Sequence, residues 1–200
     1  AVQIPLIIAD PDRRAEKTRG TVDDSLVELI DLLPTFVDFC GGEPPQNILD
    51  GRSLMPLLRG ENPDWRSFAV SEYDYSCQVF RTETGRMPLD CRTYMVASKA
   101  WKYIYAPGYP PVLYDLQNDP QELIDLGRSD AHEAARQEMH GLLAQWALQY
   151  RQRETWTEAH NLKMTGQEER FGVLIGYWDE ASAAQKDPNI MPKRHRSKGE

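Results

Sequence analysis

The sequence lacks the features that mark membrane proteins, nucleic-acid-binding proteins and disulfide frameworks. No apolar run approaches the ~20 residues that a membrane-spanning helix needs. Lys and Arg number 23 against 31 Asp and Glu, a net charge of −8, and such an acidic balance disfavours partners rich in phosphate. The three cysteines are few and widely spaced, at Cys40, Cys77 and Cys91, without a Cys-x-x-Cys pair. We therefore expect no nucleic-acid partner, no membrane partner, and a reducing, cytoplasmic location.

A complete catalytic constellation is also missing. The sequence contains neither of the Gly-rich phosphate-binding patterns, nor the two-glycine turn that presents a nucleophilic serine. Its four histidines, His132, His140, His160 and His195, form no pair at the i, i+4 spacing of helical metal ligands. From the residues alone we expect no catalytic residue and no metal ligand in this chain.

What is present at the start of the chain resembles part of a larger fold. Residues 2–9 are almost continuously apolar, which is typical of a strand buried in a parallel sheet. Asp31 can cap a following helix, and Cys40 on the apolar side of that helix is expected to be buried. We interpret residues 1–42 as a strand and a helix from a large parallel-sheet layer, and the Pro- and Gly-rich residues 43–66 as a connecting segment.

Residues 67–152 predict a small antiparallel sheet covered by one long helix. Alternating apolar and polar residues indicate about four strands, at residues 67–73, 92–97, 100–105 and 112–116. Trp101, Tyr103 and Tyr105 share one face of the third strand. Such an aromatic face can serve as a binding platform, but more often it packs against a helix.

The covering helix is predicted from Asp130 to about residue 152, with Asp130 and Glu133 as a capping-box-like start. Its apolar stripe at helical spacing consists of Ala135, Met139, Leu142, Leu143, Trp146 and Tyr150. The predicted fold class is therefore α+β, with a sheet of about four strands packed on one long helix.

Residues 112–126, VLYDLQNDPQELIDL, predict a strand followed by a capped helical turn. Asp119 takes the cap position, Pro120 the first helical position, and Glu122 can reach back to the N–H of the cap residue. We assign Asp119 and Glu122 as a structural cap with a contribution of about 1 kcal/mol.

The end of the chain combines an arm, residues 153–180, with a basic, solvated tail, residues 181–200. The arm contains an apolar octet, and its candidate oligomerisation residues are Phe171, Leu174, Ile175, Tyr177 and Trp178. Side chains of this size gain ~1.5–3 kcal/mol each on full burial. The octet can fold back onto its own sheet or pack on a neighbouring chain, and we favour packing in a homo-oligomer.

Several segments resemble the C-terminal part of the sulfatases, within the alkaline phosphatase superfamily. They are IPLIIADP, VELIDLLPTFVDFCGGEPP, LDGRSLMPLLRG and WKYIYAPGYPPVLYDLQNDPQELIDLG, of which LYDLxxDPxE is the most specific. These segments, together with RFGVLIGYWDE, are most similar to the branch of phosphonate monoester hydrolases and arylsulfatases. The resemblance implies the C-terminal portion of an alkaline-phosphatase-like α/β fold.

The resemblance also implies a parent enzyme that hydrolyses sulfuric or phosphonic esters. Such enzymes use a divalent metal, such as Mn or Ca, and a formylglycine made from the Cys of a Cys-x-Pro/Ala-x-Arg motif. Here Cys77 and Arg81 have that spacing, but Val79 stands where Pro or Ala belongs. We therefore expect a fragment that is inactive alone, with the N-terminal portion of its parent or copies of itself as partner.

Two other functions remain open: a non-catalytic oligomerisation or binding module, and a separate enzyme whose residues the sequence does not pair. The candidates for the rim of the parent's active site are Tyr73, Tyr75 and Arg81, in a stretch without regular pattern. The alternative for these three residues is an ordinary surface loop. The sequence does not distinguish a sulfate ester from a phosphonate or phosphate ester as substrate.

Overall fold

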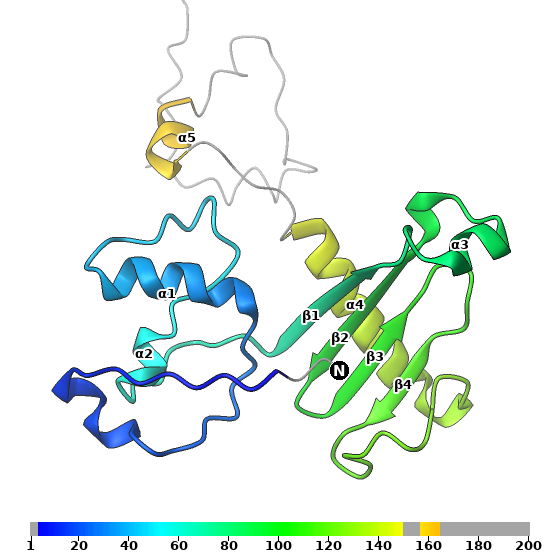
Figure 1. The fold of residues 1–200 in the computed structure, drawn as a ribbon, viewed down its shortest axis with the longest axis horizontal. Helices are drawn as coiled ribbons and strands as arrows, with labels where there is room; N and C mark the ends of the chain where they lie inside the picture. The colour runs from blue at the N-terminus through cyan, green and yellow to red at the C-terminus, as the bar shows by residue number, and fades with distance from the viewer. Residues whose placement is uncertain (1–3, 150–156, 165–200) are drawn as a thin grey trace, which may run out of the picture. The chain divides into compact units, whose positions relative to one another are not determined.

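A computed structural model of the chain describes residues 4–149 and 157–164 (Figure 1). The chain divides into two units, residues 1–153 and 154–200. In the second unit the described residues form helix α5, Glu158–Met164. The predicted oligomer arm at residues 171–178 and the basic tail lie outside the described residues. None of the described helices has both the length and the apolar character needed to cross a bilayer.

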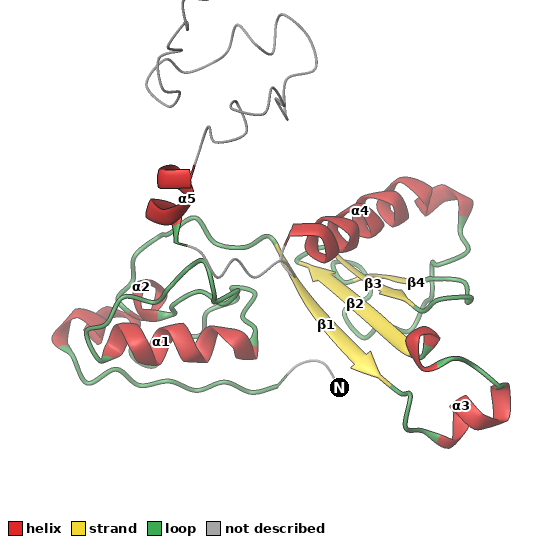
Figure 2. Ribbon diagram, turned by 90° about the horizontal axis from the view of Figure 1, so that it is seen from above, coloured by secondary structure: helices red, strands yellow, loops and turns green. Residues whose placement is uncertain are grey.

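Four antiparallel strands form the sheet in the order β1-β2-β3-β4 (Figure 2). They are β1 Phe68–Asp74, β2 Arg92–Ser98, β3 Trp101–Tyr105 and β4 Val112–Asp115. Val70 lies opposite Val96, Val96 opposite Tyr103, and Tyr103 opposite Leu113, so one row of apolar side chains crosses all four strands. This register confirms the predicted antiparallel sheet, because period-2 alternation places such residues on one face.

Helix α4, Glu133–Gln149, covers that face of the sheet, as both ribbon views show (Figures 1 and 2). Met139 and Leu143 are buried against the apolar row. Trp101 and Tyr105 pack at the edge of the same cluster, so the aromatic face of β3 contacts the helix. The predicted α+β fold, with one long helix on a four-stranded sheet, is confirmed.

The start of α4 differs from the prediction. A 3-10 turn at Asp130–His132 precedes it, with Ser129 as the N-cap residue. The carboxylate of Glu133 bonds to Arg136 and to Gln137, at 2.8 Å for Gln137 Nε2. The predicted capping box is not formed, because Glu133 has partners three and four residues ahead on its own helix.

The N-terminal part contains α1, Leu32–Phe39, and α2, Met55–Leu58. The side of α1 that packs inward carries Pro34 and Thr35, whereas Leu33 and Phe36 are more than half exposed. Cys40 lies at the C-cap of α1 and is exposed. The expectation that Cys40 is buried is therefore wrong, because the helix buries its other side.

Residues 4–10 have no regular secondary structure, so the strand predicted over residues 2–9 is not formed in the described part of that range. Ile7 is 92% exposed and Ile4 is 63% exposed. A parallel strand needs a neighbouring strand to bond its backbone, and the sheet of the described residues is built from β1–β4 alone. The apolar run thus has no regular secondary structure, and most of its side chains are exposed.

The remaining elements are short. They are the 3-10 turns Arg13–Thr18, Leu29–Asp31 and Pro88–Asp90, and helix α3, Val79–Thr84, which lies between β1 and β2.

Candidate functional site

The carboxylate of Asp31 is the most densely bonded charged group in the described residues that carry the resemblance. Asp31 is 0% exposed. Its two oxygens accept from both terminal nitrogens of Arg66 at 2.5 Å, from the backbone N–H of Arg52 at 2.8 Å, and from that of Glu28 at 2.8 Å. A buried carboxylate is stable only when it is paired and hydrogen-bonded in this way. Asp31 thereby connects three separate segments.

Glu28 extends this cluster to the sheet. Its Oε1 accepts the backbone N–H of Val70 in β1 at 2.7 Å, and its Oε2 lies 3.3 Å from Nη1 of Arg66. Burial raises the pKa of Glu28, while the Val70 N–H and the Arg66 guanidinium act in the opposite direction. Glu28, Asp31 and Arg66 thus form a buried joint between the N-terminal segment and the sheet.

The LDGRS segment is bound to the same joint through its backbone. A Cβ on Gly51 would lie 2.1 Å from the carbonyl oxygen of Ile30, so only glycine permits this approach. Ser53 donates to Asp38 at 2.5 Å, and the N–H of Leu54 donates to the hydroxyl of Thr35 at 2.9 Å. These contacts give the segment a role in holding α1.

A cavity of about 270 Å³ opens beside the joint, between the N-terminal segment, β1 and α4. Trp65 and Trp146 contribute aromatic walls, and Arg52 and Arg66 contribute charge. Arg66 is engaged by Asp31, and the guanidinium of Arg52 donates to the backbone oxygen of Asp64 at 3.2 Å. The arginines of this cavity are therefore committed to contacts within the domain.

The three rim candidates lie around the connection from β1 to β2. Tyr73 is 58% exposed at the end of β1, and its hydroxyl accepts from Gln78 at 3.3 Å. The hydroxyl of Tyr75 donates to the carbonyl of Asp90 at 3.3 Å, and Arg81 lies on α3. The structure therefore places Tyr73 on a strand and Arg81 on a helix, so the predicted stretch without regular pattern is wrong for these two residues, and only Tyr75 lies in a loop.

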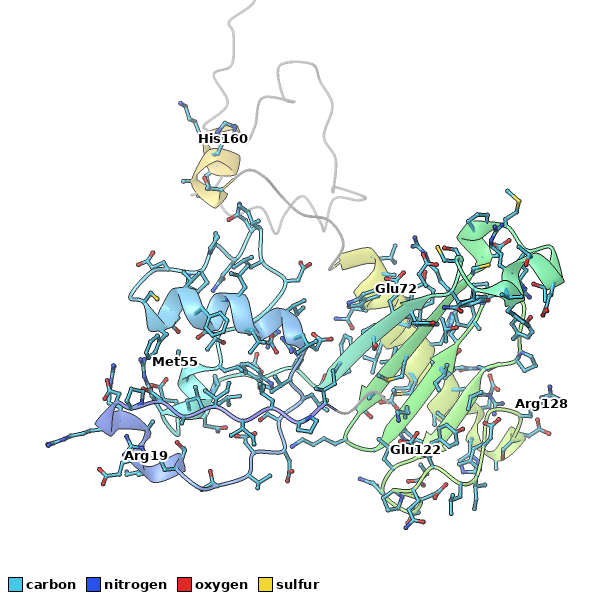
Figure 3. All side chains as sticks on the ribbon, viewed as in Figure 1. Arg19, Met55, Glu72, Glu122, Arg128 and His160 are labelled. Carbon is cyan, nitrogen blue, oxygen red and sulfur yellow. The ribbon has the colours of Figure 1, made fainter. Side chains whose placement is uncertain are left out.

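Asp119 and Glu122 do not cap a helix, because residues 119–126 contain no helix. The carboxylate of Asp119 accepts the N–H of Ile124 at 2.8 Å, across the loop. Glu122, labelled in Figure 3, takes the left-handed conformation, φ 57°. Its carboxylate pairs with Lys102 on β3 at 2.6 Å. The prediction that Glu122 reaches back to its own cap is wrong, because the N–H of Asp119 is bonded to the carbonyl of Asp115.

The cysteines and histidines of the described residues form no shared metal site. Cys91 is buried and its thiol donates to the carbonyl of Met87 at 3.4 Å, while Cys77 is exposed ahead of α3. His132 and His140 bond to Ser129 and Tyr103 instead of converging. Among residues 4–149 and 157–164, no three His, Cys, Asp or Glu side chains gather at metal-binding distance.

The four-stranded sheet, the covering helix and the buried joint define a C-terminal domain of the sulfatase type. The family model "N-sulphoglucosamine sulphohydrolase, C-terminal" matches residues 1–149, and the chain belongs to this family. The multifunctional alkaline phosphatase superfamily protein PehA of Trinickia caryophylli is 30% identical over 155 residues, which cover 76% of this chain and 30% of that protein. Arylsulfatase K of Canis lupus familiaris is 33% identical over 139 residues, covering 63% and 22%.

Solved structures agree with this membership. The phosphonate monoester hydrolase of Agrobacterium radiobacter superposes with a TM-score of 0.60 at 30% identity, over 66% of this chain and 27% of that one. The phosphonate monoester hydrolase SpPMH of Silicibacter pomeroyi gives 0.60 at 30% identity, over 68% and 28%. The chain thus spans less than a third of the length of these relatives.

The sequence pattern does not pair Asp31 with Arg66. It predicts a helix-capping role for Asp31, and nothing in the pattern around Arg66 indicates a buried partner. Only the resemblance, which includes Asp31 and Arg52 in its segments, points toward this cluster.

Proposed function

We propose that this chain is the C-terminal part of a metal-dependent hydrolase of sulfuric or phosphonic esters, and that its described residues act as a non-catalytic structural domain. The observation that carries the proposal is the buried joint at Asp31. There the polar groups of two family segments bond to one another and to Arg66 instead of facing an open site. Their role is to hold the domain together.

In the proposed parent enzyme, the divalent metal and the formylglycine belong to residues outside the described part of this chain. A metal of this kind polarises the ester and stabilises the charge that develops on its oxygens. Tyr73, Tyr75 and Arg81 are proposed as one side of the rim of that site. Their positions at and just after the end of β1 and the exposure of Tyr73 support this role.

The N-terminal segment is proposed to pack on a parallel-sheet layer of the parent. Support comes from its large exposed apolar side chains, which cost free energy in water. They are Ile4, Leu6, Ile7, Leu33, Phe36 and Phe39. The cytoplasm remains the proposed location, supported by the free thiols of all three cysteines.

Turnover assays test the proposal. The purified chain is incubated with 4-nitrophenyl sulfate and with a 4-nitrophenyl phosphonate monoester, in the presence of Mn²⁺ or Ca²⁺. We expect no hydrolysis by this chain and hydrolysis of one of the two esters by the full-length product of the gene. Turnover by the chain that disappears specifically in Cys77→Ala would overturn the proposal, because Cys77 has the Arg spacing of the formylglycine motif.

A further inference from the structure

The connection from β1 to β2, residues 75–91, extends beyond one end of the sheet, and we call it the α3 excursion (Figures 1 and 2). No residue of α3 is buried. Val79 is 69% exposed and Phe80 is 45% exposed, and Met87, just after the helix, is 67% exposed. A short helix that buries no side chain has no core of its own to hold it in place. The position of α3 therefore depends on contacts at the two ends of the excursion.

The first end of the excursion is bound to the start of β2. The backbone N–H of Tyr75 donates to the carbonyl of Cys91 at 2.9 Å, and its hydroxyl donates to the carbonyl of Asp90 at 3.3 Å. The ring of Tyr75 also lies 5.9 Å from that of Phe80, measured between centroids. These contacts close the base of the excursion, whereas the segment that follows α3 depends on other contacts.

Arg86 binds that segment to the turn between β3 and β4. Its Nη1 donates to the carbonyl of Pro107 at 2.8 Å, and its guanidinium carbon lies 4.4 Å from the centroid of the Tyr109 ring. A Cβ at Gly108 would lie 3.0 Å from Nη2 of Arg86, so the guanidinium packs closely on the turn. A planar guanidinium can donate a hydrogen bond and stack on an aromatic ring at the same time. We call this pair the Arg86–Tyr109 latch.

Arg81 is the charged side chain whose position on α3 depends on these contacts. It is half-buried, and its guanidinium makes no hydrogen bond or ion pair with the described residues. Withdrawing a charge from water without a partner costs free energy. An anionic ligand at this place would recover that cost through charge-assisted hydrogen bonds. A sulfate or phosphonate monoester carries such a negative charge.

We propose that the Arg86–Tyr109 latch positions the α3 excursion so that Arg81 binds the anionic group of the ester substrate. Arg81 is then a substrate-binding residue, and Arg86 is a positioning residue that acts through it. This inference rests on the proposed function, in which Tyr73, Tyr75 and Arg81 form one side of the rim of the active site. It adds the role of Arg81 and the contact that holds it in place.

The latch is tested by amide hydrogen exchange of the 200-residue chain, which requires no enzymatic activity. Arg86→Lys keeps the charge but removes the planar guanidinium, and Tyr109→Leu removes the ring but stays apolar. Arg128→Lys is the matched control, because Arg128 is exposed and makes no bond with the described residues (Figure 3). We expect the amides of residues 79–86 to exchange about ten-fold faster in both latch variants, with the strand amides and the control unchanged. Equal exchange in all variants would overturn the latch.

The role of Arg81 is tested by steady-state kinetics of the full-length product of the gene, with the ester that it hydrolyses. Arg81→Gln should raise KM about ten-fold with little change in kcat, because loss of a charge-assisted contact weakens substrate binding. Arg86→Lys should also raise KM, whereas Arg128→Lys should not. The double variant Arg81→Gln/Arg86→Lys should have the KM of Arg81→Gln alone, because Arg86 acts through Arg81.

Each part of the proposal has an outcome that contradicts it. An unchanged KM in Arg81→Gln would overturn the binding role of Arg81. Additive effects in the double variant, or faster exchange with an unchanged KM in Arg86→Lys, would overturn the positioning role of Arg86. A full-length protein that hydrolyses neither ester would refute the proposed function and the role of Arg81 with it, whereas the latch depends on the exchange result alone.

Discussion

Arg66 donates two parallel hydrogen bonds to Asp31, one from each terminal guanidinium nitrogen to one carboxylate oxygen, both at 2.5 Å. The side chain of Asp31 is 0% exposed and that of Arg66 is 9% exposed, so both charges are withdrawn from water. A bidentate pair of this kind constrains the relative orientation of the two side chains and is stronger than a single neutral hydrogen bond. It ties Asp31 of the N-terminal segment to Arg66, which lies two residues before the start of β1.

We expect Arg66→Ala to destabilise the chain by about 3–5 kcal/mol, because it leaves the Asp31 carboxylate buried without a counter-charge. The matched control is Arg14→Ala. It breaks the pair with Asp12, in which the two side chains are 61% and 39% exposed, and should cost far less, because water screens exposed ion pairs. Urea unfolding followed by circular dichroism measures both. Similar losses for the two variants would show that Asp31 is not held as described.

Gly51→Ala should disrupt the packing of the LDGRS segment. Its new Cβ would lie 2.1 Å from the carbonyl oxygen of Ile30, a backbone atom that cannot move aside cheaply. Gly141→Ala is the control, because a Cβ at that position of α4 meets nothing within 4 Å. Alanine within a helix is favoured over glycine by about 0.5–1 kcal/mol. The midpoint temperature of thermal unfolding should therefore fall for Gly51→Ala and rise for Gly141→Ala.

Asp119→Ala removes the acceptor for the N–H of Ile124. We expect a loss of about 0.5–1.5 kcal/mol, the usual contribution of one hydrogen bond, without loss of any activity that the full-length protein shows. Chemical unfolding gives the stability, with the exposed Asp24→Ala as a reference. Activity that vanished at unchanged stability would assign Asp119 a functional role instead of a structural one.

Glu28 should make stability depend on pH. Burial raises its pKa above the ordinary 4.5, so between 4.5 and the raised value the folded state binds more protons than the unfolded state. Its contribution is then present at low pH and is lost as the pH rises through the folded pKa. The groups that face it are Arg66, Asp31 and Arg52.

The corresponding variant is Glu28→Gln, which can still accept the N–H of Val70. Its free energy of unfolding should improve relative to that of the unmodified chain as the pH rises above 4.5. Denaturant titrations at several pH values, with the exposed Glu16→Gln as control, measure this difference. A difference that stays constant with pH would contradict the raised pKa.

The sheet and its helix could be predicted because their signals are local. In β3, Trp101, Tyr103 and Tyr105 alternate, and in α4, Met139 and Leu143 recur at helical spacing. The structure places both sets in one core. A period of 2 or 3.6 residues is set by the geometry of the backbone itself, so a few neighbouring residues are enough to reveal it.

The apolar run at residues 4–9 misled the strand prediction for a different reason. Its composition suits a buried strand, but a strand exists only when another backbone supplies its hydrogen bonds. For Glu122 the local pattern fitted a helical cap, whereas the carboxylate found Lys102, 20 positions away, at 2.6 Å. The Glu122 carboxylate therefore pairs with the charged Lys102 on β3 and not with the N–H of Asp119.

The sequence by itself determined the α+β class, the four strands, the long helix and the family segments, because each depends on residues close together in the chain. Only the tertiary structure decided which side chains meet. Arg66 reaches Asp31 across 35 positions, and Gly51 is required because the Ile30 carbonyl lies against it. Such pairings depend on how loops close in space.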